Sequence, residues 1–149
     1  VCYQYKFLMD EALSAPTDQF DDVLYKTKDC SRNIIDSYTQ PFYGLVKYAQ
    51  EEPETVRKMF ADSYEDDNGD LDVQMAKINA FFDQSNILLD KYYPGSHLYK
   101  QNSYSVSSYL FLYDPDITIC TKQHSLKLWL IVLSFMMIGV RSLMTDYFI

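Results

Sequence analysis

LDVQMAKINAFFDQSNILLDKY, residues 71–92, carries the most regular apolar pattern in this chain of 149 residues. Apolar and small side chains recur there at alternating steps of four and three, at Leu71, Met75, Ile78, Phe82, Ser85, Leu89 and Tyr92. This spacing lines one face of an α-helix, and the proline and glycine that follow at positions 94 and 95 end a helix. We therefore predict a helix over residues 71–92 whose stripe packs against other helices.

A stripe of the same period lies earlier in the chain, over residues 20–49. Its members are Phe20, Leu24, Thr27, Ser31, Ile34 and Tyr38, followed by Phe42, Leu45, Val46 and Ala49. Pro41 removes one backbone donor between the two groups, so we predict either one kinked helix or two abutting helices. Shorter helices are predicted over residues 3–13 and over residues 53–64, the latter beginning with a proline in its first turn.

The fold class that these segments predict is all-α, with a bundle of about four helices over residues 1–95. An intermolecular coiled coil is the alternative for stripes of this period, but polar members such as Thr27 and Ser85 argue against it. Residues 96–125 are polar and rich in tyrosine and have no clear period, so we predict an irregular connector. Within it, residues 109–113 are apolar on every side, which predicts a buried plug or a patch for a partner.

Leu126–Met144, LKLWLIVLSFMMIGVRSLM, is the most apolar segment of the chain. Its nineteen residues reach about 28 Å as a helix, close to the ~30 Å hydrocarbon core of a bilayer. Lys127 and Arg141 bracket the apolar run, and such side chains extend their charged ends to the membrane surface. We predict a single transmembrane helix over residues 126–145 and a short tail over residues 146–149. The alternative is a buried core helix of a soluble protein, because the uninterrupted apolar run has only thirteen residues.

The net charge of −8 is divided unevenly along the chain. Residues 1–121 hold ten Lys and Arg against twenty Asp and Glu, whereas residues 122–149 hold three basic residues and one acidic residue. An acidic body of this kind repels phosphates, which argues against binding nucleic acid. The chain begins without methionine and has no N-glycosylation acceptor, from which we expect an organellar inner membrane, either mitochondrial or thylakoid.

An acidic loop between two predicted helices resembles the calcium-binding loop of an EF-hand. With Gly69 at the sixth loop position, the side chains at four potential oxygen-ligand positions are Asp66, Asn68, Asp70 and Asp72. Tyr64 and Met75 then occupy the first and twelfth positions, where the family has carboxylates. A loop without these two ligands predicts calcium binding that is weak or absent, so we assign no metal site.

The remaining candidates for metal or nucleophilic chemistry are His97, Cys120 and His124. Cys120 and His124 are four residues apart and would share a helical face, but no motif enforces a closed ligand set or a Cys–His pair. The cysteines fit no disulfide framework, so we expect reduced thiols. The four glycines are scattered and no GxSxG motif is present, so the sequence predicts neither a cofactor nor an enzyme.

These observations favour a non-catalytic single-span accessory or assembly subunit of a larger membrane complex, respiratory or photosynthetic. Its expected partners are other subunits of that complex and the lipid bilayer. A first alternative is a membrane-tethered protein-binding or calcium-responsive module that uses the degenerate loop around Gly69. A second alternative is a soluble helical protein whose C-terminal helix is buried in its core.

Overall fold

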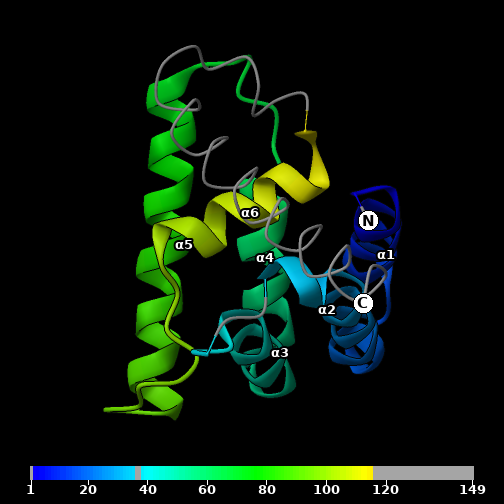
Figure 1. Cartoon of the computed structure of the whole chain (residues 1–149). Coiled ribbons are helices and arrows are strands. Elements are labelled where there is room, and N and C mark those ends of the chain that lie inside the picture. The colour runs from blue at the N-terminus through cyan, green and yellow to red at the C-terminus, as the bar shows by residue number, and fades with distance from the viewer. Residues whose placement is uncertain (1, 36–37, 116–149) are drawn as a thin grey trace, which may run out of the picture.

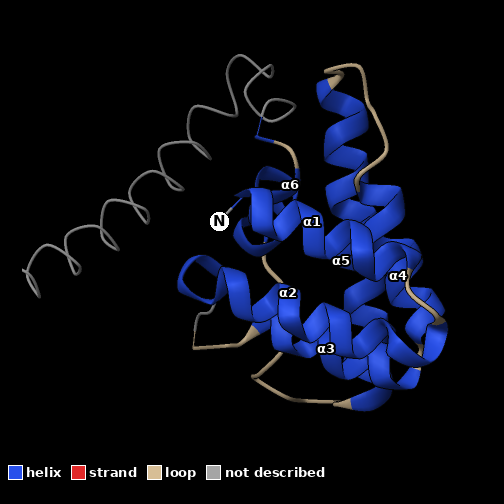
Figure 2. Ribbon diagram, turned by 90° about the vertical axis from the view of Figure 1, so that its right-hand side faces the viewer, coloured by secondary structure: helices blue, strands red, loops and turns tan. Residues whose placement is uncertain are grey.

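The computed structural model describes residues 2–35 and 38–115 of the chain, and every regular element in this part is a helix (Figure 1). Its elements are α1 (Cys2–Ser14), the short 3-10 helix η1 (Thr17–Gln19), α2 (Phe20–Ile35), α3 (Pro41–Glu51), α4 (Pro53–Ser63), α5 (Leu71–Tyr92) and α6 (Ser103–Tyr113). Figure 2 shows these helices joined by loops, with no strand in the described residues. The predicted all-α class and helical bundle are therefore confirmed for this part of the chain.

Of the two arrangements predicted around Pro41, one kinked helix or two abutting helices, the structure has two helices. α2 ends at Ile35 and α3 begins at Pro41, whose fixed φ and missing N–H suit the first turn of a helix. Gln40 precedes it with a φ of 48°, a left-handed conformation that turns the chain between the two helices. Together with α1, α4 and α5, they give residues 2–35 and 38–95 five α-helices, which fits the predicted bundle of about four.

The prediction of an irregular connector over residues 96–125 is wrong for Ser103–Tyr113, which forms α6. The side chain of Asn102 accepts a hydrogen bond from the Ser105 backbone, and the Ser105 hydroxyl accepts one from the Asn102 backbone, so a capping box starts the helix. α6 crosses the middle of the bundle and is buried on most sides (Figure 1). A helix without a solvent face has no amphipathic period, which is why its pattern was not recognised.

The core lies where α6 meets the other helices, and aromatic rings dominate it. The ring centroids of Phe42 and Tyr109 lie 5.2 Å apart and those of Phe60 and Phe81 lie 5.3 Å apart, both pairs edge to face. These are the separations that aromatic pairs prefer in protein interiors. Residues from α3, α4, α5 and α6 therefore share one core.

The buried stripe of α5 is rotated from the predicted one. Its buried members are Gln74, Ile78, Phe81, Ser85, Leu88 and Leu89, whereas Leu71 and Met75 are exposed. Two adjacent apolar residues stand at positions 81–82 and again at 88–89. Either of two neighbouring faces of the helix, with the same spacing, could therefore face the core. Because Phe81 stacks edge to face on Phe60 of α4, packing selects the register that buries Phe81.

A buried polar network fixes the start of α6 against the start of α3. The Gln101 amide donates to the backbone carbonyl of Pro41 at 2.7 Å, and its carbonyl oxygen accepts from the hydroxyls of Ser105 and Tyr109, both at 2.9 Å. Buried polar groups cost little when each has a partner, and they then specify a single arrangement. Gln101 therefore orients α6 in the core.

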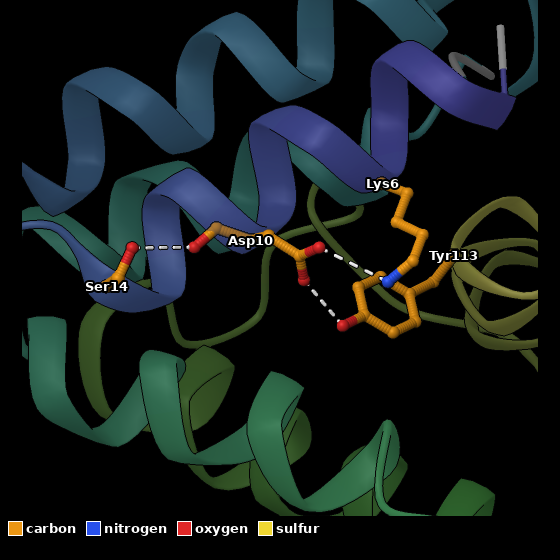
Figure 3. Close-up of polar contacts among 4 residues, drawn as sticks. All are labelled: Lys6, Asp10, Ser14 and Tyr113. Carbon is orange, nitrogen blue, oxygen red and sulfur yellow. Dashed lines mark hydrogen bonds and ion pairs between the residues drawn. The ribbon is translucent and has the colours of Figure 1, made fainter.

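The far end of α6 is fixed to α1 (Figure 3). The Tyr113 hydroxyl donates to the Asp10 carboxylate at 2.6 Å, and the same carboxylate accepts from Lys6 at 3.2 Å. The Tyr113 ring stacks on Tyr64 with 3.8 Å between ring centroids, and burial and the bond to Asp10 raise the pKa of Tyr113. The first and last described helices are thus joined directly.

No helix within residues 2–35 and 38–115 combines the length and apolarity needed to cross a membrane. The segment predicted to do so, residues 126–145, lies outside the described residues, as does the tail at 146–149.

Candidate docking groove between α4 and α5

α4 and α5 lie side by side (Figure 2). Their side chains leave an open groove of about 310 Å³ between the two helices. All the residues that line it belong to these two helices: Thr55, Lys58, Met59, Asp62, Ser63, Lys77, Ala80, Phe81 and Gln84. Met59 and Phe81 are buried and form an apolar floor, while Lys58 and Asp62 are exposed at the edge. Ala80 has a single methyl group at the surface and adds little bulk to the α5 wall. The groove is therefore apolar at its base and polar at its rim.

A second face of α5, apolar at three of its five positions, extends beyond the lining residues of the groove at both ends. Val73, Lys77, Ala80, Gln84 and Ile87 recur at steps of four and three, which places them on one face of the helix. Val73 is 42% exposed and Ile87 is 57% exposed. Large apolar side chains left in water beside an apolar groove are typical of a surface that a partner covers.

Glu52 holds one end of the groove. Its carboxylate accepts from the Lys91 ammonium at 2.8 Å, from the Tyr92 hydroxyl at 2.6 Å and from the Thr55 hydroxyl at 3.2 Å. The hydrogen bonds from Lys91 and Tyr92 lower the pKa of Glu52. These contacts join the residue that precedes α4 to the last turn of α5, so the separation of the two helices is fixed there.

The turn between α4 and α5 holds the other end. Lys77 of α5 donates a hydrogen bond to the backbone carbonyl of Glu65, and the Asp70 carboxylate caps α5 by accepting from the backbone N–H groups of Asp72 and Val73. The groove is thus bounded by helices that are tied together beyond both of its ends.

The rim of the groove is more basic than the rest of the acidic chain. Lys58 pairs with Asp62 one turn along α4, and this hydrogen bond raises the pKa of Lys58. Both side chains remain largely exposed, at 75% and 55%, so the pair is open to other partners. Together with Lys77, the groove carries two lysines against one aspartate.

The acidic loop that resembles an EF-hand uses its carboxylates to shape the turn. Asp66 accepts from the Asn68 N–H and Asp67 from the Gly69 N–H, both at 2.9 Å, while Asp70 caps α5. Asn68 and Gly69 have φ values of 53° and 74°, a left-handed bend in which glycine is favoured. Within the described residues, no three His, Cys, Asp or Glu side chains, Asp72 included, converge as metal ligands.

The structure does not bring together the other candidate residues. His97 is exposed in the loop that follows α5, and Cys120 and His124 lie outside the described residues. Cys2 and Cys30 are both free thiols. Burial raises the pKa of the Cys30 thiol, the direction that opposes formation of a nucleophilic thiolate.

The groove residues were not predicted from the sequence, although one signal for them was present. Val73 and Ile87 are apolar but do not fit the stripe that begins at Leu71, and such residues indicate a second packing face on the same helix. The contribution of α4 had no comparable signal, because Glu52 and Lys58 resemble the charged residues of any solvated helix face.

Comparisons with protein-family models, with curated protein sequences and with solved structures find no match to this chain.

Proposed function

We propose that the chain is a non-catalytic, single-span accessory or assembly subunit of a larger membrane protein complex. In this proposal residues 126–145 anchor the chain in the bilayer and the helical bundle is the docking body. The observation that carries the proposal is that the described helices fill a core of their own, around Phe42, Phe60 and Tyr109, and leave an open groove outside it. A body with a filled interior and an apolar outer groove is suited to binding another protein.

The use of the interior polar groups supports a structural role. The Tyr5 and Tyr64 hydroxyls bond each other at 3.0 Å, and Gln101 is occupied by Pro41 and Tyr109. Burial raises the pKa of both Tyr5 and Tyr64 far above the ordinary value, which keeps the phenols neutral. Groups held in this way stabilise helix packing and are poorly placed for acid–base chemistry near neutral pH.

The proposed partners are the bilayer and other subunits of the complex, in an organellar inner membrane that is mitochondrial or thylakoid. The length and apolarity of Leu126–Met144 support the bilayer, and the acidic charge of the bundle argues against nucleic acid. The groove between α4 and α5 supports a protein partner.

Alkaline carbonate extraction of membranes from cells expressing the full chain tests the anchor. We expect the wild-type chain to stay in the membrane pellet and Leu133→Arg to shift toward the supernatant. An arginine near the middle of a span opposes insertion by about 2.5–3.5 kcal/mol. Leu98→Arg is the matched control, because Leu98 is already 37% exposed in the bundle. Release of the wild-type chain into the supernatant would instead favour a soluble protein with a buried C-terminal helix.

A further inference from the structure

We propose that the groove between α4 and α5 binds one amphipathic helix of a partner protein, with an apolar stripe that enters the groove and acidic residues beside that stripe. The inference rests on the proposed docking function and adds to it a site and a class of partner. It is carried by the shape of the groove, by its charge and by the contacts that hold it open.

The shape of the groove suits a helix. Its two walls are antiparallel helices whose lining residues recur every three or four positions, such as Thr55, Met59 and Asp62 on α4. This is the spacing by which a third helix places its side chains between two others. From Val73 to Ile87, the exposed face of α5 is about 21 Å long, which a partner helix of about 15 residues would match.

The charge of the groove indicates that the partner helix has acidic residues beside its apolar stripe. Lys58 stands on the α4 rim and Lys77 on the α5 wall. The Lys77 ammonium donates one hydrogen bond to the Glu65 carbonyl, and its other N–H groups remain for a helix lying between the two lysines. Asp62 is the single carboxylate among the lining residues, and its pair with Lys58 is exposed. Glutamates beside the apolar stripe of the partner can therefore reach both lysines at the rim.

The same charges argue against two other occupants. A second copy of the chain would bring a net charge of −8 as a whole to an already acidic molecule, whereas a partner helix needs only the few glutamates that face Lys58 and Lys77. The segment Leu126–Met144 carries Lys127 and Arg141 at its ends, which would meet the lysines of the groove. That segment is also apolar on all sides, so one groove would leave most of its surface in water.

The groove is preformed in the unbound chain. Glu52 ties the start of α4 to Lys91 and Tyr92 at one end, and Lys77 contacts the turn at the other. A groove held at both ends needs little rearrangement on binding, so less of the interaction energy is lost to ordering.

Fluorescence anisotropy with synthetic peptides tests the proposal on the full chain in lipid nanodiscs. The first labelled peptide has about 15 residues, a leucine stripe at helical spacing and glutamates beside it. The second has lysines in place of the glutamates, and the third has the composition of the first in an order without a stripe. We expect the glutamate peptide to bind about tenfold more tightly than the lysine peptide, and the unstriped peptide not to bind.

Two variants of the chain locate the binding. Ala80→Trp fills the groove from an exposed position and should weaken binding of the glutamate peptide at least about tenfold. Ala76→Trp is the matched control, because Ala76 is exposed on the same helix but does not line the groove. The double variant Lys58→Glu, Lys77→Glu should reverse the peptide preference, whereas Lys26→Glu, Lys100→Glu makes the same change in net charge elsewhere. Circular dichroism of each variant identifies any that fail to fold.

The proposal would be overturned if Ala80→Trp bound the glutamate peptide as tightly as the wild-type chain does. It would also be overturned if the wild-type chain bound the glutamate and lysine peptides with equal affinity. A dimer seen by ultracentrifugation and lost in Ala80→Trp would assign the groove to a second copy. A dilution-independent amine cross-link between Lys77 and Lys127 would assign it to the chain's own tail. None of these results changes the outcome of carbonate extraction, so failure of the groove and failure of the membrane anchor are distinguishable.

Discussion

At the residue scale, two buried tyrosine hydroxyls differ in whether they have a partner. Tyr109 donates to Gln101 at 2.9 Å, whereas the Tyr48 hydroxyl is buried and has no hydrogen-bond partner among residues 2–35 and 38–115. Burial raises the pKa of Tyr48, so the phenol stays neutral and the missing bond costs less than a buried charge would. The same chemical group therefore contributes differently to stability at the two sites.

We predict that Tyr109→Phe lowers the free energy of unfolding by about 0.5–1.5 kcal/mol, the net value of a protein hydrogen bond. Tyr48→Phe should be neutral or stabilising, because it removes a buried hydroxyl that has no partner in the described part of the chain. Urea denaturation followed by circular dichroism measures both variants on the same scale. An equal loss in the two would show that the Tyr48 hydroxyl has a partner in solution.

At the element scale, the turn before α5 shows how the carboxylates of the acidic loop are used. Asp70→Ala removes the acceptor of the Asp72 and Val73 N–H groups and should cost about 1 kcal/mol of stability. We expect the loss to be the same in calcium and in chelator, because the carboxylate acts here as a helix cap. Calorimetric heat from calcium that is present in the wild-type chain and absent in Asp70→Ala would contradict this.

The contact between α4 and α5 predicts a dependence of stability on pH. Hydrogen bonds from Lys91 and Tyr92 lower the pKa of Glu52 in the folded chain. The stabilisation from Glu52 is therefore present above the ordinary glutamate pKa of about 4.3 and is lost as the pH falls through the lowered value. Wild-type and Glu52→Gln chains should differ in free energy of unfolding near pH 7 and converge in acid.

The neighbouring substitution Glu51→Gln is the control for this measurement, because Glu51 is exposed and lies just before the groove contact. A difference between wild-type and Glu52→Gln chains that persists unchanged in strong acid would mean that the carboxylate charge is not what holds the end of the groove.

At the scale of the whole molecule, helices with one solvent-exposed face could be predicted from the sequence. The buried helix α6 and the groove could not. The stripes of α2 and α5 predicted their helices because one face of each meets water. α6 was missed because burial on most sides removes the period. The groove was missed because it depends on how Glu52 of one element meets Lys91 of another, and pairings between distant elements are not encoded in local spacing.

The link between the first and last described helices is also testable as a property of the whole bundle. Asp10→Ala removes the acceptor of Tyr113 on α6, so we expect faster amide hydrogen exchange in α6 as well as in α1. Glu11→Ala, one residue further along the exposed surface of α1, is the control and should leave α6 unchanged. Faster exchange confined to α1 would show that the two helices open independently.

The contact between Asp10 and Tyr113 also has a consequence for synthesis, because its partners lie 103 positions apart. At about 5–20 residues per second, a ribosome takes roughly 5 to 20 s to add the second partner after the first. During that interval α2 and α4, which also contact the first helix, are made, but α6 is still missing. The Asp10 carboxylate therefore remains without its Tyr113 partner until α6 has been synthesised.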